Sequence, residues 1–220
     1  MKLAIFDFDG TLFPFDTFSF VVSQLKKHPQ YKSRYHKFMI GFLPTYILYK
    51  LKVLARNKMV NTATKQLIAA LDGMTRDELY YFYEKVYSVM KSRINKQVAN
   101  EVADSKAMGF HPIIVSGAVC PLLEYVGKEL AIDTIIGTEI PIKNGRVNAN
   151  TEIDHIFGPR KLTKLLEIYP QEKVDWGSSC AYADSFSDLD ILELVGSPVA
   201  VQPDERLAEI ANNKGWKIIS

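Results

Sequence analysis

The chain has 220 residues, of which 47% are hydrophobic and 24% are charged. This length accommodates one sizeable α/β domain with a smaller appendage, and the balance of apolar and charged residues excludes a disordered or low-complexity chain. The net charge of +2 is unevenly distributed, because residues 13–95 carry 14 Lys and Arg against 5 Asp and Glu while the rest of the chain is acidic. Such a basic segment indicates either contact with an anionic partner or a solvated basic surface.

The first residues and the cysteines bear on the cellular compartment in which the protein is expected. The apolar run that begins at Met1 is interrupted by Asp7 and Asp9, before a secretory signal of about 7–15 apolar residues is complete. We therefore expect a cytoplasmic protein. Cys120 and Cys180 lie neither in a C-x-x-C pair nor near a His at metal-ligand spacing, so free thiols are expected rather than a disulfide or a zinc site.

Alternating strand and helix patterns define the expected fold. Short apolar runs typical of buried strands occupy residues 2–6, 112–115, 133–136, 179–183, 198–201 and 216–219, and Ser116-Gly117 is expected to end the second. Helical patterns lie at about 97–108, 119–130, 160–169, 187–194 and 204–214. This alternation predicts an α/β fold with a Rossmann-like parallel sheet covered by helices on both faces. A hairpin is expected around Asn144-Gly145, a dipeptide that favours a two-residue type I′ turn.

Residues 13–95 have no strand pattern and are expected to form an all-helical cap, inserted into a core of residues 1–12 and 96–220. Thr75-x-x-Glu78 is a capping box at a helix start. An apolar stripe then predicts the buried face of that helix: Leu79, Phe82, Tyr83, Val86, Val89 and Met90. Residues 38–54 are the most apolar stretch, but Pro44, Lys50 and Lys52 interrupt it and it is shorter than the roughly 20 residues that span a bilayer.

Two carboxylates follow the first predicted strand. Because side chains two positions apart in extended chain point the same way, Asp7 and Asp9 are expected to project together from the carboxyl end of the strand, where parallel sheets bind ligands. The alternative is a purely structural turn formed by Asp9-Gly10.

Four separated motifs together resemble those of the haloacid dehalogenase superfamily, over nearly the whole chain. They are Asp7-x-Asp9-x-Thr11, Ser116 at the end of a strand, Lys161 at the start of a helix, and Asp184 with Asp188 after a later strand. The helical insertion directly after the first motif is similar to the phosphoserine-phosphatase-like branch. Asp184 follows Ala183 where many relatives have Gly, a departure that a short side chain should tolerate.

The resemblance implies phosphoryl transfer and a role for each motif. Asp7 would be the nucleophile that forms an aspartyl-phosphate, and Asp9 would protonate the leaving oxygen and then deprotonate the hydrolytic water. Phosphate-binding groups would be Thr11, Ser116, Gly117 and Lys161. We expect the pKa of Asp9 to be raised, because the side chain must begin as an acid beside Asp7.

A divalent cation is expected at these acidic residues. Four aspartates and one lysine leave an excess of negative charge that would repel a phosphate dianion, and all-oxygen ligands suit Mg²⁺. The implied ligands are the carboxylates of Asp7 and Asp184 and the backbone carbonyl of Asp9. For Asp188 three alternatives stay open: support of the metal through water, an ion pair with Lys161, or an ordinary acid at a helix start.

The expected function is therefore a magnesium-dependent phosphatase acting on a small or amphiphilic phosphomonoester. Asp16 and Arg56 are candidates for substrate specificity. Related phosphoserine phosphatases carry a Glu a few residues after the nucleophile, where this chain has Asp16, and an Arg in the cap, for which Arg56 is a possible counterpart. A phosphotransferase would share every site residue and differ in its acceptor. A non-catalytic module could use the basic insertion on nucleic acid or an anionic membrane, although clustered carboxylates make nucleic acid an unexpected partner. The sequence carries no signal for the oligomeric state.

Overall fold

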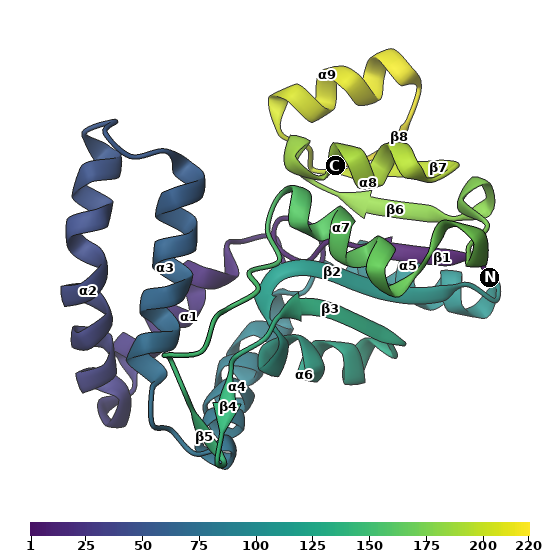
Figure 1. The fold of residues 1–220 in the computed structure, drawn as a ribbon. Coiled ribbons are helices and arrows are strands. Elements are labelled where there is room, and N and C mark those ends of the chain that lie inside the picture. The colour runs from purple at the N-terminus through teal and green to yellow at the C-terminus, as the bar shows by residue number, and fades with distance from the viewer.

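A six-stranded parallel sheet forms the centre of the computed structural model, which describes residues 1–220. Its spatial order is β3-β2-β1-β6-β7-β8, so the first strand lies in the middle (Figure 1). The strands are β1 (Leu3–Phe6), β2 (His111–Val119), β3 (Thr134–Thr138), β6 (Cys180–Ala183), β7 (Ser197–Val201) and β8 (Lys217–Ile219). The α/β fold with a parallel sheet is thus confirmed.

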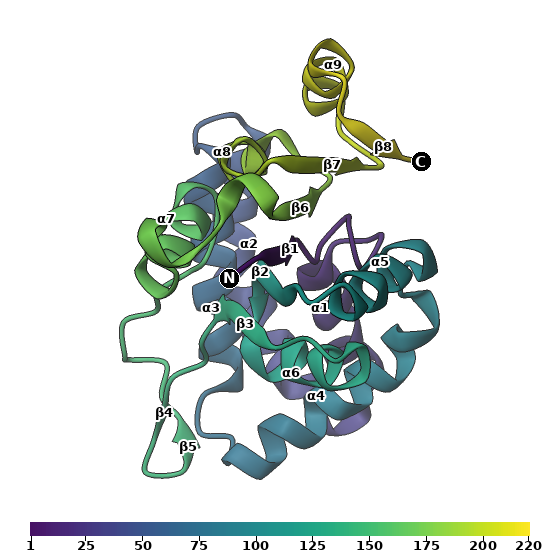
Figure 2. The same cartoon turned by 90° about the vertical axis from the view of Figure 1, so that its right-hand side faces the viewer.

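Both faces of the sheet are buried, as the continuous apolar runs predicted. In β1, Ala4 and Phe6 belong to one hydrophobic cluster whereas Leu3 and Ile5 belong to the other, because successive side chains point to opposite faces. The first face is covered by α4 (Arg76–Met90), α5 (Lys96–Ala107) and α6 (Cys120–Leu130), and the second by α7 (Pro159–Ile168), α8 (Leu189–Leu194) and α9 (Glu205–Lys214). Figure 2 shows the two helical layers on opposite sides of the strands.

The inserted segment contains α1 (Thr17–Lys27), α2 (Lys32–Lys50), α3 (Arg56–Leu71) and α4. Its two ends meet, since the backbone N–H of Asn95 donates to the carbonyl of Leu12 at 2.8 Å. Helices α2 and α3 form an antiparallel hairpin that stands apart from the sheet (Figure 1), whereas α4 packs on α6 and shares its hydrophobic cluster. The division into a core and a separate cap therefore stays a prediction. No helix of the protein has the length and apolar character needed to cross a bilayer.

Helix α4 begins at the predicted capping box: the Thr75 hydroxyl accepts from the Glu78 N–H, and the Glu78 carboxylate accepts from the Thr75 N–H. Its predicted buried stripe is correct except at Val89, which is 42% exposed. At 100° per residue, Val89 lies roughly 80° from Leu79, at one edge of the stripe. At the opposite edge Tyr87 is buried and stacks on Tyr125 of α6, with ring centroids 6.1 Å apart.

One further detail of the strands differs from the sequence-based expectation, and another agrees with it. Strand β2 does not end at Ser116 but continues to Val119, with a shift in its pairing to β3 between Val115 and Val119. Such an irregularity lets a strand bend without terminating. The predicted hairpin forms as β4 (Ile142–Lys143) and β5 (Arg146–Val147), and it docks on the loop before α4, where Arg76 N–H donates to the Gly145 carbonyl at 2.9 Å.

Candidate active site

A buried lysine joins two aspartates at the carboxyl end of the sheet. Lys161 Nζ lies 2.7 Å from Asp7 Oδ1 and 2.7 Å from Asp188 Oδ1. All three side chains are buried. Asp7 follows β1, Lys161 lies in the first turn of α7, and Asp188 lies between β6 and α8. Three stretches that are distant in sequence therefore meet in one cluster of paired charges. Of the three alternatives for Asp188, the structure shows the ion pair with Lys161.

Asp184 completes this cluster from the end of β6. Carboxylate oxygens of Asp7, Asp184 and Asp188 all lie within 4.8 Å of one another. Gly10 makes room for this arrangement, because a Cβ at that position would come 2.1 Å from Asp184 Oδ2. Gly10 also has a φ of +79°, which side-chain-bearing residues adopt only at a cost.

Asp9 lies beside the cluster and faces the start of α1. Its Oδ1 accepts a hydrogen bond from the Thr17 N–H at 2.8 Å and another from the Thr17 hydroxyl. Its carboxyl group does not belong to the three-carboxylate cluster, and the predicted contribution of its backbone carbonyl to a metal stays a prediction. The Thr17 contacts hold the carboxyl group in one orientation.

The predicted phosphate-binding residues lie on neighbouring segments. Phe6 pairs with Ile114 of β2, so Ser116 stands two residues beyond the paired end of β1 and is buried. Its Oγ accepts from the Ala118 N–H at 3.1 Å, which leaves the hydroxyl proton free to donate. The buried Thr11 hydroxyl has no hydrogen-bond partner. A buried hydroxyl without a partner is costly, and a ligand oxygen would relieve that cost.

The protonation equilibria of the carboxylates are strongly shifted. Burial, with contributions from Asp7 and Asp188, raises the pKa of Asp184 to about 8. Burial also raises the pKa of Asp7 to about 6, against the opposing effect of Lys161. Desolvation raises the pKa of Asp9 to about 7, with Asp7 as a smaller cause. The direction for Asp9 agrees with the sequence-based expectation, although desolvation rather than its neighbour is the leading cause.

The donor set fits a hard divalent cation. Three carboxylates share the cluster and Lys161 is the one cationic side chain paired with them, so negative charge is in excess when all three are ionised. Burial raises the pKa values because it disfavours that ionised state. A divalent cation would supply the missing positive charge, and oxygen-only donors suit hard cations such as Mg²⁺, Ca²⁺ and Mn²⁺.

A cavity of about 380 Å³ lies beside Asp9, between α1, the hairpin α2–α3 and the end of β2. It begins at Asp9 and Gly117, and both predicted specificity candidates, Asp16 and Arg56, line it. Asp16 also caps α1, with Oδ2 accepting from the Ser19 N–H at 2.9 Å. Eleven of the 19 lining residues are hydrophobic, so the space beside Asp9 is predominantly apolar.

Sequence reasoning missed several polar residues of this cavity, among them Thr17 and His155. Thr17 donates hydrogen bonds to Asp9. The signal that could have identified Thr17 is its position directly after Asp16, at the start of a helix. His155 links the loop before α7 to α3, with Nδ1 2.8 Å from Asn61 Oδ1 and Nε2 3.4 Å from Thr64 Oγ1. Burial lowers the pKa of His155 to about 4, so the ring is neutral near pH 7. Residues 151–157 carry no pattern that pointed to it.

Known proteins resemble the chain in sequence and in fold. It is 27% identical over 136 residues to the "Inhibition of morphological differentiation protein" of Streptomyces azureus, covering 62% of this chain and 49% of that protein. It is 22% identical over 181 residues to phosphoserine phosphatase SerB1 of Mycobacterium tuberculosis, covering 82% and 59%. The chain thus spans about half to three fifths of the length of these curated relatives.

Solved structures share the fold over nearly the entire chain. A Bordetella pertussis protein of unknown function superimposes with a TM-score of 0.79 at 22% identity, covering 100% of this chain and 98% of that one. A phosphoserine phosphatase structure described as a phospho-aspartyl intermediate analogue gives a TM-score of 0.64 at 17% identity, covering 99% and 92%. The family model for haloacid dehalogenase-like hydrolases matches residues 4–193, and the chain therefore belongs to the haloacid dehalogenase-like hydrolase family.

Proposed function

We propose that the protein is a magnesium-dependent phosphatase that hydrolyses a phosphomonoester through an aspartyl-phosphate on Asp7. The observation that carries the proposal is the buried cluster in which Lys161 holds Asp7 and Asp188 at 2.7 Å each, with Asp184 alongside. A charge cluster of this kind is costly to bury and is a weak source of stability. Its position at the carboxyl ends of parallel strands favours a role in ligand binding.

Each residue then has a chemical task. One carboxylate oxygen of Asp7 attacks phosphorus while Lys161 orients the other and neutralises charge on the phosphoryl oxygens. Asp9, whose pKa of about 7 keeps a proton available near neutrality, donates that proton to the leaving oxygen and accepts one from the hydrolytic water. Ser116 and Thr11 supply hydroxyl donors, and Gly117 a backbone donor, to the phosphoryl oxygens.

Asp7, Asp184 and the backbone carbonyl of Asp9 would hold the Mg²⁺, with Asp188 supporting the site through Lys161. The bound cation would supply the positive charge that lets a carboxylate approach an anionic phosphoryl group. Without added charge, the carboxylates repel the dianion that they must receive.

The cavity supports a leaving group with an apolar body. Phe42, Met59 and Val60 contribute apolar lining, and Arg56 contributes a positive charge. An amphiphilic phosphomonoester offers apolar surface for that lining to bury, which a small charged molecule such as phosphoserine does not. We therefore expect long-chain alkyl phosphates to be hydrolysed with a higher kcat/KM than phosphoserine. A clear preference for phosphoserine would contradict this substrate class.

Steady-state kinetics with p-nitrophenyl phosphate and Mg²⁺ test the reaction itself. Asp7→Asn should lower kcat by at least about 10⁴-fold, the scale seen when a nucleophile that acts as part of a unit is removed. Asp190→Asn, an exposed acid on α8, is the matched control and should retain activity. Full activity of Asp7→Asn would refute the scheme. Diversion of the phosphoryl group to added methanol instead of water would identify a phosphotransferase.

A further inference from the structure

From Phe38 to Tyr49, helix α2 is apolar around its circumference but poorly buried. Phe38 and Phe42 pack toward α1, with ring centroids 5.7 Å and 6.4 Å from that of Phe18. Phe38 is nevertheless the only fully buried residue among its 19. A helix that is hydrophobic on all sides is normally enclosed by protein or lipid. The outward face of α2 therefore lacks the environment that its sequence requires.

The exposed apolar residues concentrate at one end of the hairpin. We call residues 46–58 the hairpin tip, which comprises the end of α2, the connecting residues 51–55 and the start of α3. Within this segment large apolar side chains are exposed at Tyr46 (39%), Ile47 (48%), Leu48 (44%), Leu51 (66%) and Val53 (72%). Contiguous exposed apolar residues at the end of a protrusion mark an interaction surface rather than ordinary surface variation.

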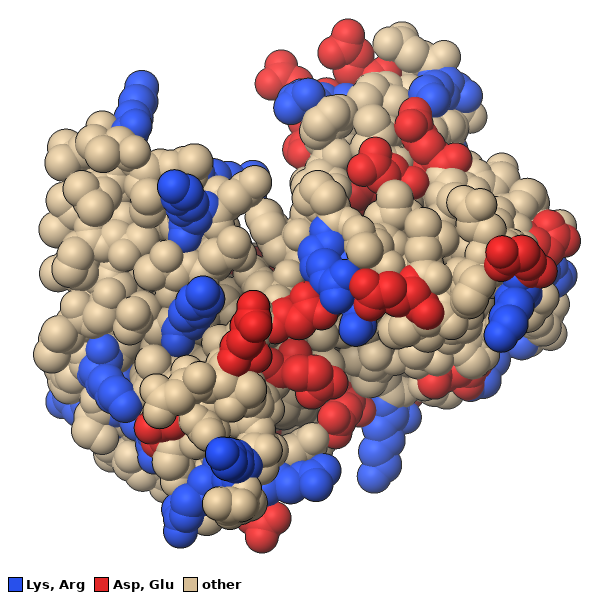
Figure 3. Space-filling model, in the orientation of Figure 1, with Lys and Arg blue, Asp and Glu red and all other residues tan.

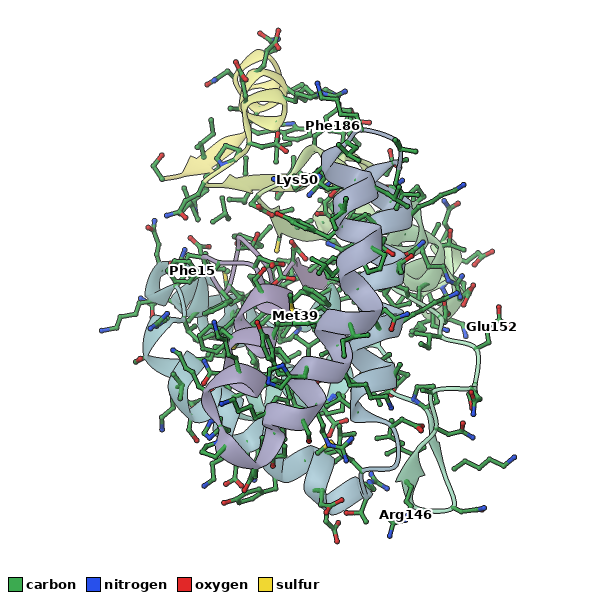
Figure 4. All side chains as sticks on the ribbon, turned by 90° about the vertical axis from the view of Figure 1, so that its left-hand side faces the viewer. Phe15, Met39, Lys50, Arg146, Glu152 and Phe186 are labelled. Atoms are coloured by element: carbon green, nitrogen blue, oxygen red, sulfur yellow. The ribbon has the colours of Figure 1, made fainter.

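The same segment is positively charged without compensation. Residues 17–71 contain ten Lys and Arg and no Asp or Glu. Four of these basic residues are exposed at the hairpin tip: Lys50, Lys52, Arg56 and Lys58. Figure 3 shows the upper part of the hairpin lobe with blue side chains and no red ones, and Figure 4 shows Lys50 near the upper end of α2, well above Met39.

We propose that the hairpin tip docks on an anionic lipid surface. Leu51 and Val53 would enter the boundary between headgroups and acyl chains, while Lys50, Lys52 and Lys58 would contact lipid phosphates. Apolar insertion and attraction to anionic lipid act together in this binding mode. In this mode the protein would lie on the surface of the bilayer.

Other partners fit this surface less well. Nucleic acid would engage the basic residues, but its phosphates offer nothing to exposed Leu and Val side chains. A second copy of the chain would bring two uncompensated basic tips together, which like charge opposes. An anionic bilayer satisfies both the apolar and the basic residues. Because Tyr46 and Arg56 also line the cavity beside Asp9, docking would place that cavity close to the membrane surface.

Cosedimentation with vesicles tests the proposal and requires no catalytic activity. We expect the full chain to bind vesicles containing 30% phosphatidylglycerol far more tightly than pure phosphatidylcholine vesicles, and to be weakened by salt. Lys50→Gln/Lys52→Gln/Lys58→Gln should lose on the order of 100-fold in affinity, since each basic residue near an anionic surface contributes about fivefold. Leu51→Ser/Val53→Ser should lose at least about tenfold.

Matched controls have the same chemical changes elsewhere. Lys128→Gln/Lys143→Gln/Lys173→Gln changes three exposed lysines that lie outside the inserted helical segment. Met108→Ser/Ile168→Ser changes two side chains, also outside it, that are 64% and 44% exposed. Both controls should bind like the unmodified protein. Every variant should retain hydrolysis of p-nitrophenyl phosphate, a soluble substrate, if it is folded.

Insertion depth provides the decisive readout. A Trp introduced by Val53→Trp should be quenched by brominated lipid, whereas the native Trp176 and Trp216 in the unmodified protein should not. Failure to bind anionic vesicles at low salt would overturn the proposal. Binding that is unchanged in both tip variants, or an unquenched Trp at position 53, would do so equally. Retention of an acidic protein by the tip in place of vesicles would also count against it.

Discussion

The buried site cluster and the hairpin tip are opposites: the cluster has charged side chains in the interior, whereas the tip has apolar side chains exposed to solvent. At the site, Asp7, Lys161 and Asp188 are buried and paired with one another. At the tip, Leu51 and Val53 are exposed, and the neighbouring lysines have no acidic partner. Each region violates the usual separation of polar outside and apolar inside. Neither arrangement is a strong source of stability for the fold, which supports the binding roles proposed for both regions.

Removal of Lys161 should produce the largest effect on the cluster. Lys161→Met leaves Asp7 and Asp188 buried without their cation, so we expect the free energy of unfolding to fall by about 3–5 kcal/mol in metal-free protein. Lys164→Met, about one turn further along α7, removes two partly exposed ion pairs, to Asp154 and Glu167, and should cost at most about 1 kcal/mol. Urea unfolding measures both. An equal decrease in the free energy of unfolding for the two variants would show that the buried ion pairs contribute no more to stability than the partly exposed ones.

Two leucines of the hairpin contrast its inner and outer surfaces. Leu71→Ala removes a fully buried side chain at the end of α3 and should destabilise the protein by about 2–5 kcal/mol. Leu51→Ala removes a side chain that is 66% exposed and should change stability by no more than about 0.5 kcal/mol. Thermal and urea denaturation check this. A large loss at Leu51 would mean that the tip serves the fold and not a partner.

Substitutions at two glycines distinguish the cost of backbone strain from the cost of a clash with Asp184. Gly10 and Gly73 have φ values of +79° and +77°, so Ala at either position should cost about 1–2 kcal/mol from the backbone alone. Only at Gly10 would the new Cβ strike Asp184, whereas nothing lies within 4 Å at Gly73. We expect Gly10→Ala also to weaken Mg²⁺ binding at least about tenfold, and Gly73→Ala to leave it unchanged. Isothermal titration calorimetry measures the difference.

The shifted carboxylates predict a pH-dependent effect on the stability of the metal-free protein. Asp7, Asp9 and Asp184 have folded pKa values of about 6, 7 and 8, all above the ordinary value of 3.8. Between pH 4 and pH 8 the folded metal-free protein therefore binds more protons than the unfolded chain, and stability falls as pH rises. We expect Tm to decrease across this window without metal and Mg²⁺ to stabilise the protein most at the alkaline end. Asp184→Asn should flatten the metal-free slope, and an unchanged slope would contradict these assignments.

Much of this architecture could be predicted from sequence because the relevant signals are local. Runs such as residues 2–6 are apolar without interruption because β1 is buried on both faces. The motifs around Asp7, Lys161 and Asp184 stand at strand ends and a helix start, which parallel topology brings to one edge of the sheet. Their places at strand ends and a helix start in a parallel fold were thus sufficient to predict that these residues meet.

Features that depend on contacts between distant segments could not be predicted. Ser116-Gly117 has the composition of a strand end, yet pairing with β3 carries β2 on to Val119. The packing of α4 on α6 and the link from His155 to Asn61 require knowledge of which surfaces meet. Periodicity also could not decide between Val89 and Tyr87 at the edges of the α4 stripe, because α6 covers only one of them.

The proposed function depends on phosphorylation of Asp7 itself. Its most direct test is acid quenching of Asp9→Asn mixed with p-nitrophenyl phosphate and Mg²⁺, followed by peptide mapping. Because p-nitrophenolate leaves without needing a proton, this variant should still transfer the phosphoryl group and then accumulate it on Asp7, lacking the base that activates water. Label on the peptide that contains Asp7 is the expected result, and label elsewhere or on no peptide would contradict the account.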